Sequence, residues 1–196
     1  MISEFETLWG RTISFGLAQL IEFQESQSAF ECYSQGFGIA TDYRDGLESW
    51  SDDPQFLDKL FPFAQANGSG SFYAFWDSGE DYLSMHLMPI VVFGDEGGQW
   101  VVAESFDELL QLLSYDTEIT VLPDDVYFYK DEDDDKNEDA QIFREWLGQY
   151  FKHLPIVTSN EQADMIIKNA QQKYQAKFND WLSGFGIEVS EYNLDE

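Results

Sequence analysis

Residues 89–103, PIVVFGDEGGQWVVA, contain the clearest strand signals in the chain. Pro89 to Phe93 is a short and entirely apolar run, which is typical of a strand buried on both faces of a sheet. Gly94 to Gly98 is a turn with three glycines, and Trp100 to Ala103 is apolar again. The stretch therefore predicts two antiparallel strands joined by a glycine-containing loop, with the first strand in the centre of the sheet.

The segments on either side of this hairpin extend the sheet and cover it. Residues 71–76, SFYAFW, are aromatic and β-prone, and turn residues flank them, so they predict a further strand. Ser105 with Glu108, and Ser159 with Gln162, have the spacing of a helix capping box, and the leucines after Glu108 supply a buried helix face. Short strands are expected at 119–122 and at 126–129, on either side of a proline-containing turn.

Helices are expected toward both ends of the chain. Apolar residues at helical spacing predict helices near 12–25, over about 142–151 and over 159–183. A loop-rich stretch at 34–54 leads into a short helix that has Pro54 at its start.

This order of helices, strands and helices predicts the α+β class. We expect a mixed, mainly antiparallel β-sheet flanked by helices, with an added C-terminal helical element. We divide the chain into an α+β core over residues 1–122 and a second part over residues 123–196. The second part contains an acidic loop and the C-terminal helices, which we expect to pack on the same domain. A chain of 196 residues is long enough to form one domain with its own apolar core.

The chain is strongly acidic, because 38 Asp and Glu against ten Lys and Arg give a net charge of −28. Such a field repels nucleic acids, which bind through Lys and Arg, and it repels anionic lipid headgroups. A basic protein is the natural complement, so we expect a protein partner, no nucleic acid and no membrane. The first residues lack the features of a signal peptide, and the single cysteine, Cys32, allows no internal disulfide, so we expect a cytoplasmic protein.

Residues 131–139, DEDDDKNED, carry seven carboxylates in nine positions. Their alternation resembles a calcium-binding loop, but Lys136 stands where such a loop needs glycine and Ile142 where it needs a bidentate glutamate. A solvated acidic loop and a protein-docking patch both remain open, and a metal site is the least favoured of the three. We expect no metal and no cofactor.

No arrangement of residues in the sequence favours catalysis. His86 and His153, the only histidines, lie 67 residues apart, and neither an HExxH zinc motif nor a GxSxG nucleophile motif is present. We interpret His86 as a packed or exposed side chain and His153 as a cation favoured by a helix C-terminus. Asn67 to Gly70 precedes a strand, whereas phosphate-binding loops follow one. We therefore expect that the protein is not an enzyme.

Several of these motifs together resemble a known family. FPFA at 61–64, the turn at 67–70 and the aromatic strand at 71–76 resemble the first half of the signature of the SUKH superfamily, which contains the yeast Smi/Knr cell-wall regulator. The hairpin at 89–103 and the helix that begins SFDELL resemble the second half, so the similarity covers about residues 56–114. The resemblance implies an α+β fold and a binding module without catalytic residues. Bacterial members are largely immunity proteins that bind and block a toxin, often a nuclease.

We therefore predict an immunity protein that binds and neutralises a cognate basic toxin through electrostatic and aromatic contacts. An acidic inhibitor can imitate the phosphate charge that a nuclease holds, and electrostatic steering increases its association rate. The alternative is an acidic intracellular adaptor or regulatory scaffold that has no toxin target. The residues that we expect to bind the partner lie in the acidic stretch and in the strand before it: Asp124, Asp125, Tyr127, Tyr129, Asp131, Asp133, Asp134 and Asp135.

Overall fold

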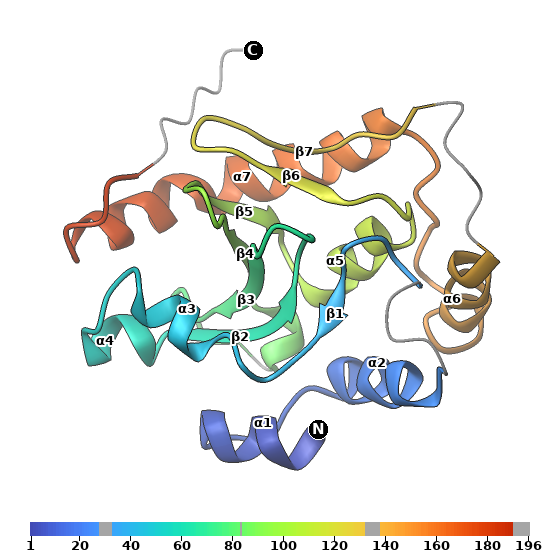
Figure 1. Ribbon diagram of the computed structural model, residues 1–196, viewed down its shortest axis with the longest axis horizontal. Helices are drawn as coiled ribbons and strands as arrows, with labels where there is room; N and C mark the ends of the chain where they lie inside the picture. Colours follow the sequence, from blue (N-terminus) through green and yellow to red (C-terminus); the bar gives the residue numbers. More distant parts are fainter. Residues whose placement is uncertain (28–32, 83, 132–137, 190–196) are drawn as a thin grey trace.

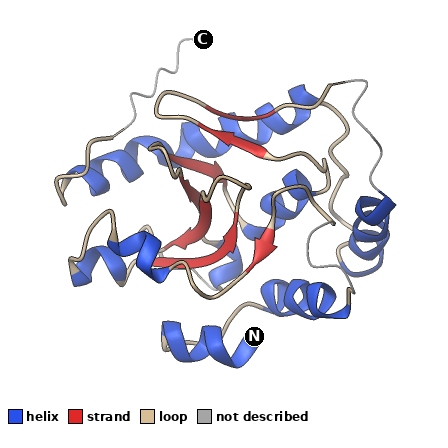
Figure 2. Ribbon diagram, in the orientation of Figure 1, coloured by secondary structure: helices blue, strands red, loops and turns tan. Residues whose placement is uncertain are grey.

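A five-stranded antiparallel sheet forms the centre of the part of the chain that the computed structural model describes, which is residues 1–27, 33–82, 84–131 and 138–189 (Figure 1, Figure 2). The strands follow one another in the sheet in chain order: β1 (Gly38–Ile39), β2 (Leu60–Gln65), β3 (Phe72–Trp76), β4 (Ile90–Phe93) and β5 (Gln99–Ala103). All four pairings are antiparallel. The predicted α+β class, with a mainly antiparallel sheet flanked by helices, is confirmed.

The helices of the described residues are α1 (Ile2–Trp9), α2 (Phe15–Ser26), α3 (Arg44–Glu48), α4 (Pro54–Leu57), the 3-10 helix η1 (Met85–Leu87), α5 (Phe106–Leu113), α6 (Glu138–Tyr150) and α7 (Asn160–Ser183). The sequence predicted α2, α4, α5, α6 and α7, but it did not predict α1, α3 or η1. The stretch 34–54, predicted to be loop-rich, contains β1 and α3 between its turns. The apolar stripe predicted for α6 is only partly right, because Phe143 and Leu147 are buried whereas Ile142 and Tyr150 are exposed.

Serine side chains cap the starts of α2, η1, α5 and α7, and the capping-box spacing predicted the last two. The Ser105 hydroxyl accepts a hydrogen bond from the Glu108 backbone N–H at the start of α5 (3.5 Å). At the start of α7 the Ser159 hydroxyl accepts one from the Gln162 backbone N–H (3.4 Å). Each contact satisfies one of the N–H groups that a helix leaves without an internal partner.

Both faces of the central sheet are buried, because side chains alternate between two apolar cores along each strand. On β3, Tyr73 and Phe75 belong to the core that contains residues of α2 and α5. Phe72 and Trp76 belong to the opposite core, to which α4 and the second half of α7 contribute. All four residues of β4 are fully buried, which confirms the prediction of a central strand.

Strand β2 was not predicted, because its sequence LFPFAQ contains Pro62. A proline in the middle of a strand removes a donor from the hydrogen-bond ladder, so it normally argues against a central strand. Here the register between β2 and β3 shifts between Pro62 and Ala64. A β-bulge of this kind accommodates the missing donor, and β2 lies in the interior of the sheet.

A glutamine side chain closes each outer edge of the central sheet. The Gln24 amide of α2 bonds to both the N–H (2.8 Å) and the C=O (3.0 Å) of Ile39 on β1. The Gln175 amide of α7 accepts from the N–H of Val101 (2.7 Å) and donates to the C=O of Gln99 (3.1 Å) on β5. Both edge strands are therefore paired with side chains instead of being left open to another chain.

A second, two-stranded sheet consists of β6 (Ile119–Val121) and β7 (Val126–Phe128), which confirms the two short strands predicted there. This hairpin crosses the division that we placed between residues 122 and 123. Trp100 Nε1 of β5 donates to the C=O of Leu122 (2.9 Å), and the Asn67 amide donates to the C=O of Ile119 (3.2 Å). The central sheet thereby holds the hairpin beside α7, as Figure 1 shows.

Candidate functional site

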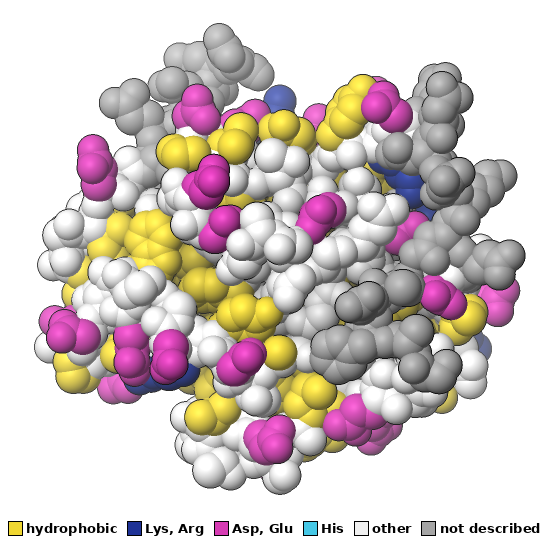
Figure 3. All heavy atoms as spheres, in the orientation of Figure 1, with side chains coloured by type: hydrophobic (Ala, Val, Ile, Leu, Met, Phe, Trp, Pro, Cys, Tyr) yellow, Lys and Arg dark blue, Asp and Glu magenta, His cyan; other side chains and the backbone are white. Residues whose placement is uncertain are grey.

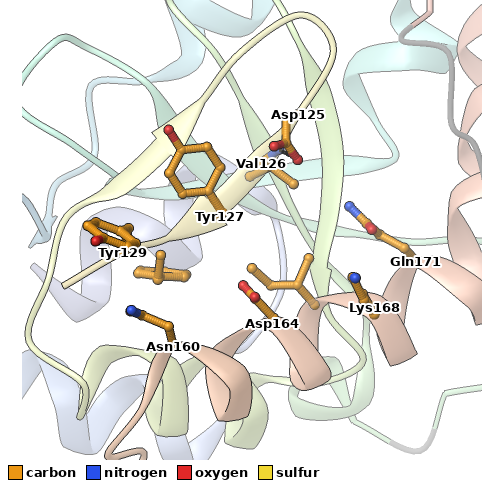
Figure 4. Close-up of a pocket in the computed structure, with 10 residues that line it drawn as sticks. Asp125, Val126, Tyr127, Tyr129, Asn160, Asp164, Lys168 and Gln171 are labelled. Atoms are coloured by element: carbon orange, nitrogen blue, oxygen red, sulfur yellow. Dashed lines mark hydrogen bonds between the residues drawn. The ribbon is translucent and has the colours of Figure 1, made fainter. Parts of the chain in front are cut away.

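A groove of about 320 Å³ separates β7 from the first half of α7 (Figure 4). We call it the β7–α7 groove. Its lining residues are Asp125, Val126, Tyr127, Phe128, Tyr129, Asn160, Asp164, Ile167, Lys168 and Gln171. The strand thus supplies aromatic and acidic residues, and the helix supplies mostly polar ones.

The outer edge of β7 faces this groove. Leu122 donates its N–H to the C=O of Asp125 (2.8 Å), so the alternation of an antiparallel ladder turns the backbone N–H and C=O of Val126 and Phe128 away from β6. At one end the Asp125 carboxylate accepts from the N–H of Val126 (2.8 Å). At the other end the Asn160 amide bonds to the N–H (2.9 Å) and the C=O (3.2 Å) of Lys130. Phe128, between these ends, has no side-chain partner for its backbone among the described residues.

On the helix side, Asn160, Asp164, Lys168 and Gln171 follow one another at intervals of three or four residues and so form one stripe of α7. Figure 4 shows Asp164, Lys168 and Gln171 projecting from α7 toward β7. The Gln171 side chain is only 7% exposed, yet its amide forms no hydrogen bond with any described residue. The amide atoms themselves reach the solvent, so they can bond to water or to a ligand in the groove.

The groove concentrates negative charge in a partly dehydrated place. Partial burial raises the pKa of Asp164, and the charges of Asp125 and Glu161 raise it further, whereas Lys168 lowers it. Lys168 is exposed at the rim and forms no ion pair with a described carboxylate. Two carboxylates therefore face the groove with one loosely placed ammonium, an arrangement that attracts a cation.

The structure brings three of the eight predicted binding residues into this groove: Asp125, Tyr127 and Tyr129. Asp124 lies outside the groove lining, exposed in the turn of the hairpin. Asp131 is exposed beside Tyr129, whose hydroxyl donates to its carboxylate (2.9 Å). Asp133, Asp134 and Asp135 lie outside the described residues.

Sequence reasoning missed the helical half of the site. Asn160, Asp164, Lys168 and Gln171 lie between the buried positions Ala163, Ile167 and Ala170, and a polar stripe beside an apolar one is typical of a solvated helix face. The spacing of these four residues was a signal, but nothing local indicated that a strand lies opposite them.

A second cluster joins the two histidines, which the sequence had left as separate side chains. His86 Nε2 lies 2.8 Å from Asp107 Oδ1 on α5, and His153 Nε2 lies 3.0 Å from Asp107 Oδ2. Only the contact with His153 is aligned as a hydrogen bond. Partial burial would raise the pKa of Asp107, but the two imidazoles outweigh it and lower the pKa. The cluster fastens η1 and the segment after α6 to the start of α5.

Within the four described ranges, no three His, Cys, Asp or Glu side chains are grouped so that they could hold a metal ion. None of the helices in the same ranges is long and apolar enough to cross a membrane. No family model, no curated protein and no solved structure matches the chain.

Proposed function

We propose that this protein is a binding module that captures a basic protein partner at the β7–α7 groove. The observation that carries the proposal is the pair of carboxylates, Asp125 and Asp164, which line the same groove as Tyr127 and Ile167 and repel one another electrostatically. Acidic groups beside aromatic side chains suit a partner that presents Lys or Arg, since aromatic rings bind both the stems and the charges of these residues.

The charge of the whole chain supports the same kind of partner. Figure 3 shows carboxylate side chains spread over the visible face, with few Lys or Arg among them. A net charge of −28 accelerates the approach of a basic protein, and steered association can reach about 10⁸–10⁹ M⁻¹s⁻¹ at low salt. The long-range field would bring the partner to the surface, and the groove would select the side chain that docks.

The partner that we propose is a toxin, and the protein would act in the cytoplasm as its immunity protein rather than as an enzyme. This part of the proposal rests on the resemblance of residues 56–114 to the SUKH superfamily. The acidic groove is compatible with it, because an inhibitor of a nuclease would meet the basic surface that the toxin uses for phosphate.

The test is co-expression with the product of the adjacent reading frame, followed by a pull-down at low and at high salt. We expect a neighbour that is lethal alone, tolerated with this protein and co-purified with it at low salt. A harmless neighbour that does not bind would contradict the toxin assignment. In that case an endogenous basic partner captured by the same groove would favour the adaptor function.

Two double variants separate the contribution of the groove to partner binding from the contribution of the net charge. Asp125→Asn with Asp164→Asn removes two charges from the groove, whereas Asp52→Asn with Asp81→Asn removes two exposed charges that do not line it. Both variants reduce long-range steering by the same two charges. We expect the groove variant to release the partner faster, and equal dissociation rates for the two variants would exclude the groove as the binding site.

A further inference from the structure

We infer that the β7–α7 groove is a docking pocket for one arginine side chain of the partner, in preference to lysine. The inference rests on the proposed function and names the chemical group that the site recognises. It follows from the size of the groove, from the hydrogen-bonding groups that face it and from the position of Lys168.

The size of the groove favours a single side chain over a strand or a helix. Just after β7 the Asn160 amide bonds directly to the backbone of Lys130, at 2.9 and 3.2 Å, so the start of α7 is in direct contact with the chain there. A bound strand would need about 4.8 Å on the open side of β7 along its whole length. A volume of about 320 Å³ instead suits one long side chain that enters from the rim.

The groups that face the groove are rich in acceptors. Asp164, Asp125 and Gln171 line it and carry carboxylate and amide oxygens. The C=O groups of Val126 and Phe128 lie on the same open edge of β7. One oxygen of Asp125 is already used by the Val126 N–H. The ligand must therefore bring several donors in different directions, together with a positive charge.

A guanidinium group meets this requirement better than an ammonium group. It carries five N–H donors in a rigid plane, whereas an ammonium carries three on one compact centre. The plane can bond a carboxylate with two parallel N–H groups and still offer donors to an amide or a backbone carbonyl. Gln171, whose amide lines the groove and has no partner among the described residues, would receive one of these donors at its oxygen.

Lys168 occupies the rim as a competing cation. Its charge lowers the pKa of Asp164, so its ammonium lies close enough to Asp164 to act on it, but it is exposed and not fixed by an ion pair with a described carboxylate. An incoming arginine would displace it toward the solvent. Removing Lys168 should therefore strengthen the binding of a cation, whereas in an anion-binding site the same change would weaken binding.

The test uses the isolated full chain and two blocked tripeptides, N-acetyl-Gly-Arg-Gly-amide and N-acetyl-Gly-Lys-Gly-amide. Binding is followed by NMR at the Gln171 side-chain amide and the Phe128 backbone N–H. We expect the arginine peptide to bind about tenfold more tightly than the lysine peptide, which corresponds to about 1.4 kcal/mol. Equal dissociation constants, or shifts that leave both reporter groups unmoved, would overturn the inference.

Three variants sharpen the result. The double variant Asp125→Asn with Asp164→Asn should abolish peptide binding, and Gln171→Leu should reduce the preference for arginine while leaving lysine binding nearly unchanged. Lys168→Met should strengthen the binding of both peptides about threefold, the size expected for one exposed like charge. Weaker binding by Lys168→Met would contradict a cation pocket.

Free L-arginine is the last ligand to be tested. Its own carboxylate would be repelled by the carboxylates of the groove, so it should bind more weakly than the blocked peptide. If free arginine binds more tightly than the blocked peptide, the pocket takes the amino acid and the docking inference is wrong. The peptide assay needs no partner, so its outcome is independent of the co-expression test. A partner that still binds after loss of both groove carboxylates would refute the arginine pocket and the groove as the binding site, whereas a chain that binds the arginine peptide but captures no partner would refute only the proposed function.

Discussion

Gln24 and Gln175 bond to the two outer edges of the central sheet, whereas Asn160 bonds to only one end of the outer edge of β7. At β1 and β5 a buried amide donates to one backbone C=O and accepts from one backbone N–H, as a neighbouring strand would. At β7 the Asn160 amide does the same for Lys130, and the backbone of Phe128 is left facing the groove.

The difference between covered and uncovered strand edges is clearest at two glutamines of α7. Gln175 and Gln171 are four residues apart on the same helix, and both are buried, at 0% and 7% exposure. The amide of Gln175 bonds to β5 and also donates to Asn179 Oδ1, whereas that of Gln171 has no partner among the described residues. An open strand edge attracts other chains, and folded proteins usually cover it. Side-chain amides close the edges of the central sheet, and the arginine pocket that we infer would use the edge of β7 that they leave open.

The largest expected effect comes from Gly98→Ala, which would break the attachment of the hairpin to the central sheet. Gly98 has φ +90°, and a Cβ there would lie 2.2 Å from the backbone oxygen of Leu122. We expect a loss of about 3–5 kcal/mol in the free energy of unfolding, because a strained backbone and a clash with main-chain atoms act together. Urea unfolding of the variant and of the unchanged protein measures this loss.

Gly148→Ala is the matched control for this substitution. Gly148 lies in α6, and a Cβ there meets no atom within 4 Å. It should stabilise the protein by about 0.5–1 kcal/mol, since alanine is the better helix former. Similar losses in both variants would show that the contact between Gly98 and Leu122 does not hold the hairpin.

The second prediction tests the comparison between the two glutamines directly. Gln175→Leu should lower the free energy of unfolding by about 2–4 kcal/mol, because it leaves the buried N–H of Val101 and C=O of Gln99 without partners. Gln171→Leu, one turn earlier, should change it by less than about 0.5 kcal/mol, since no hydrogen bond is lost. Thermal and urea unfolding of the pair check this, and equal losses would refute the distinction between a closed and an open edge.

The third prediction concerns the partly closed end of β7. Asn160→Ala should cost about 1 kcal/mol, because the amide bonds to Lys130 and also accepts from the Tyr115 hydroxyl (2.8 Å), but water can replace part of these contacts. Asn169→Ala, at an exposed position of the same helix, is the control. A loss as large as that of Gln175→Leu would mean that this end of β7 is closed as tightly as β5.

The sequence predicted those elements of the fold whose signals are local. The apolar run at 90–93, the aromatic run at 72–76 and the serine caps at Ser105 and Ser159 each contain their information within a few neighbouring residues. Strand β2 was missed because Pro62 carries the opposite signal, and only the bulge between Pro62 and Ala64 makes a strand possible.

The strand half of the candidate site was also predicted, because its signals are local in the sequence. Asp125, Tyr127 and Tyr129 lie in one acidic and aromatic segment and were found by composition. Gln171 belongs to a helix more than 40 residues later in the chain, and in the sequence a buried, unpartnered glutamine cannot be told from one that faces water. Likewise, the meeting of His86 and His153 at Asp107 depends on how three separate segments pack.

The smallest effect is expected from Asp164→Asn, and its dependence on pH identifies its origin. The pKa of Asp164 lies above its ordinary value of 3.8 in the folded protein, so the folded state resists ionisation more than the unfolded state does. Ionised Asp164 therefore destabilises the fold at neutral pH, and this penalty fades as the pH falls through the raised pKa toward 3.8. Asp164→Asn should give a small stability gain at pH 7 that decreases toward pH 4 and is lost at about pH 2.5, below both pKa values. Asp52→Asn makes the same change in net charge at an exposed position, so the difference between the two variants isolates the groove. A difference that stays constant between pH 4 and pH 7 would mean that neither burial nor the nearby carboxylates raise the pKa of Asp164, and the attraction of the groove for a cation would lose this support.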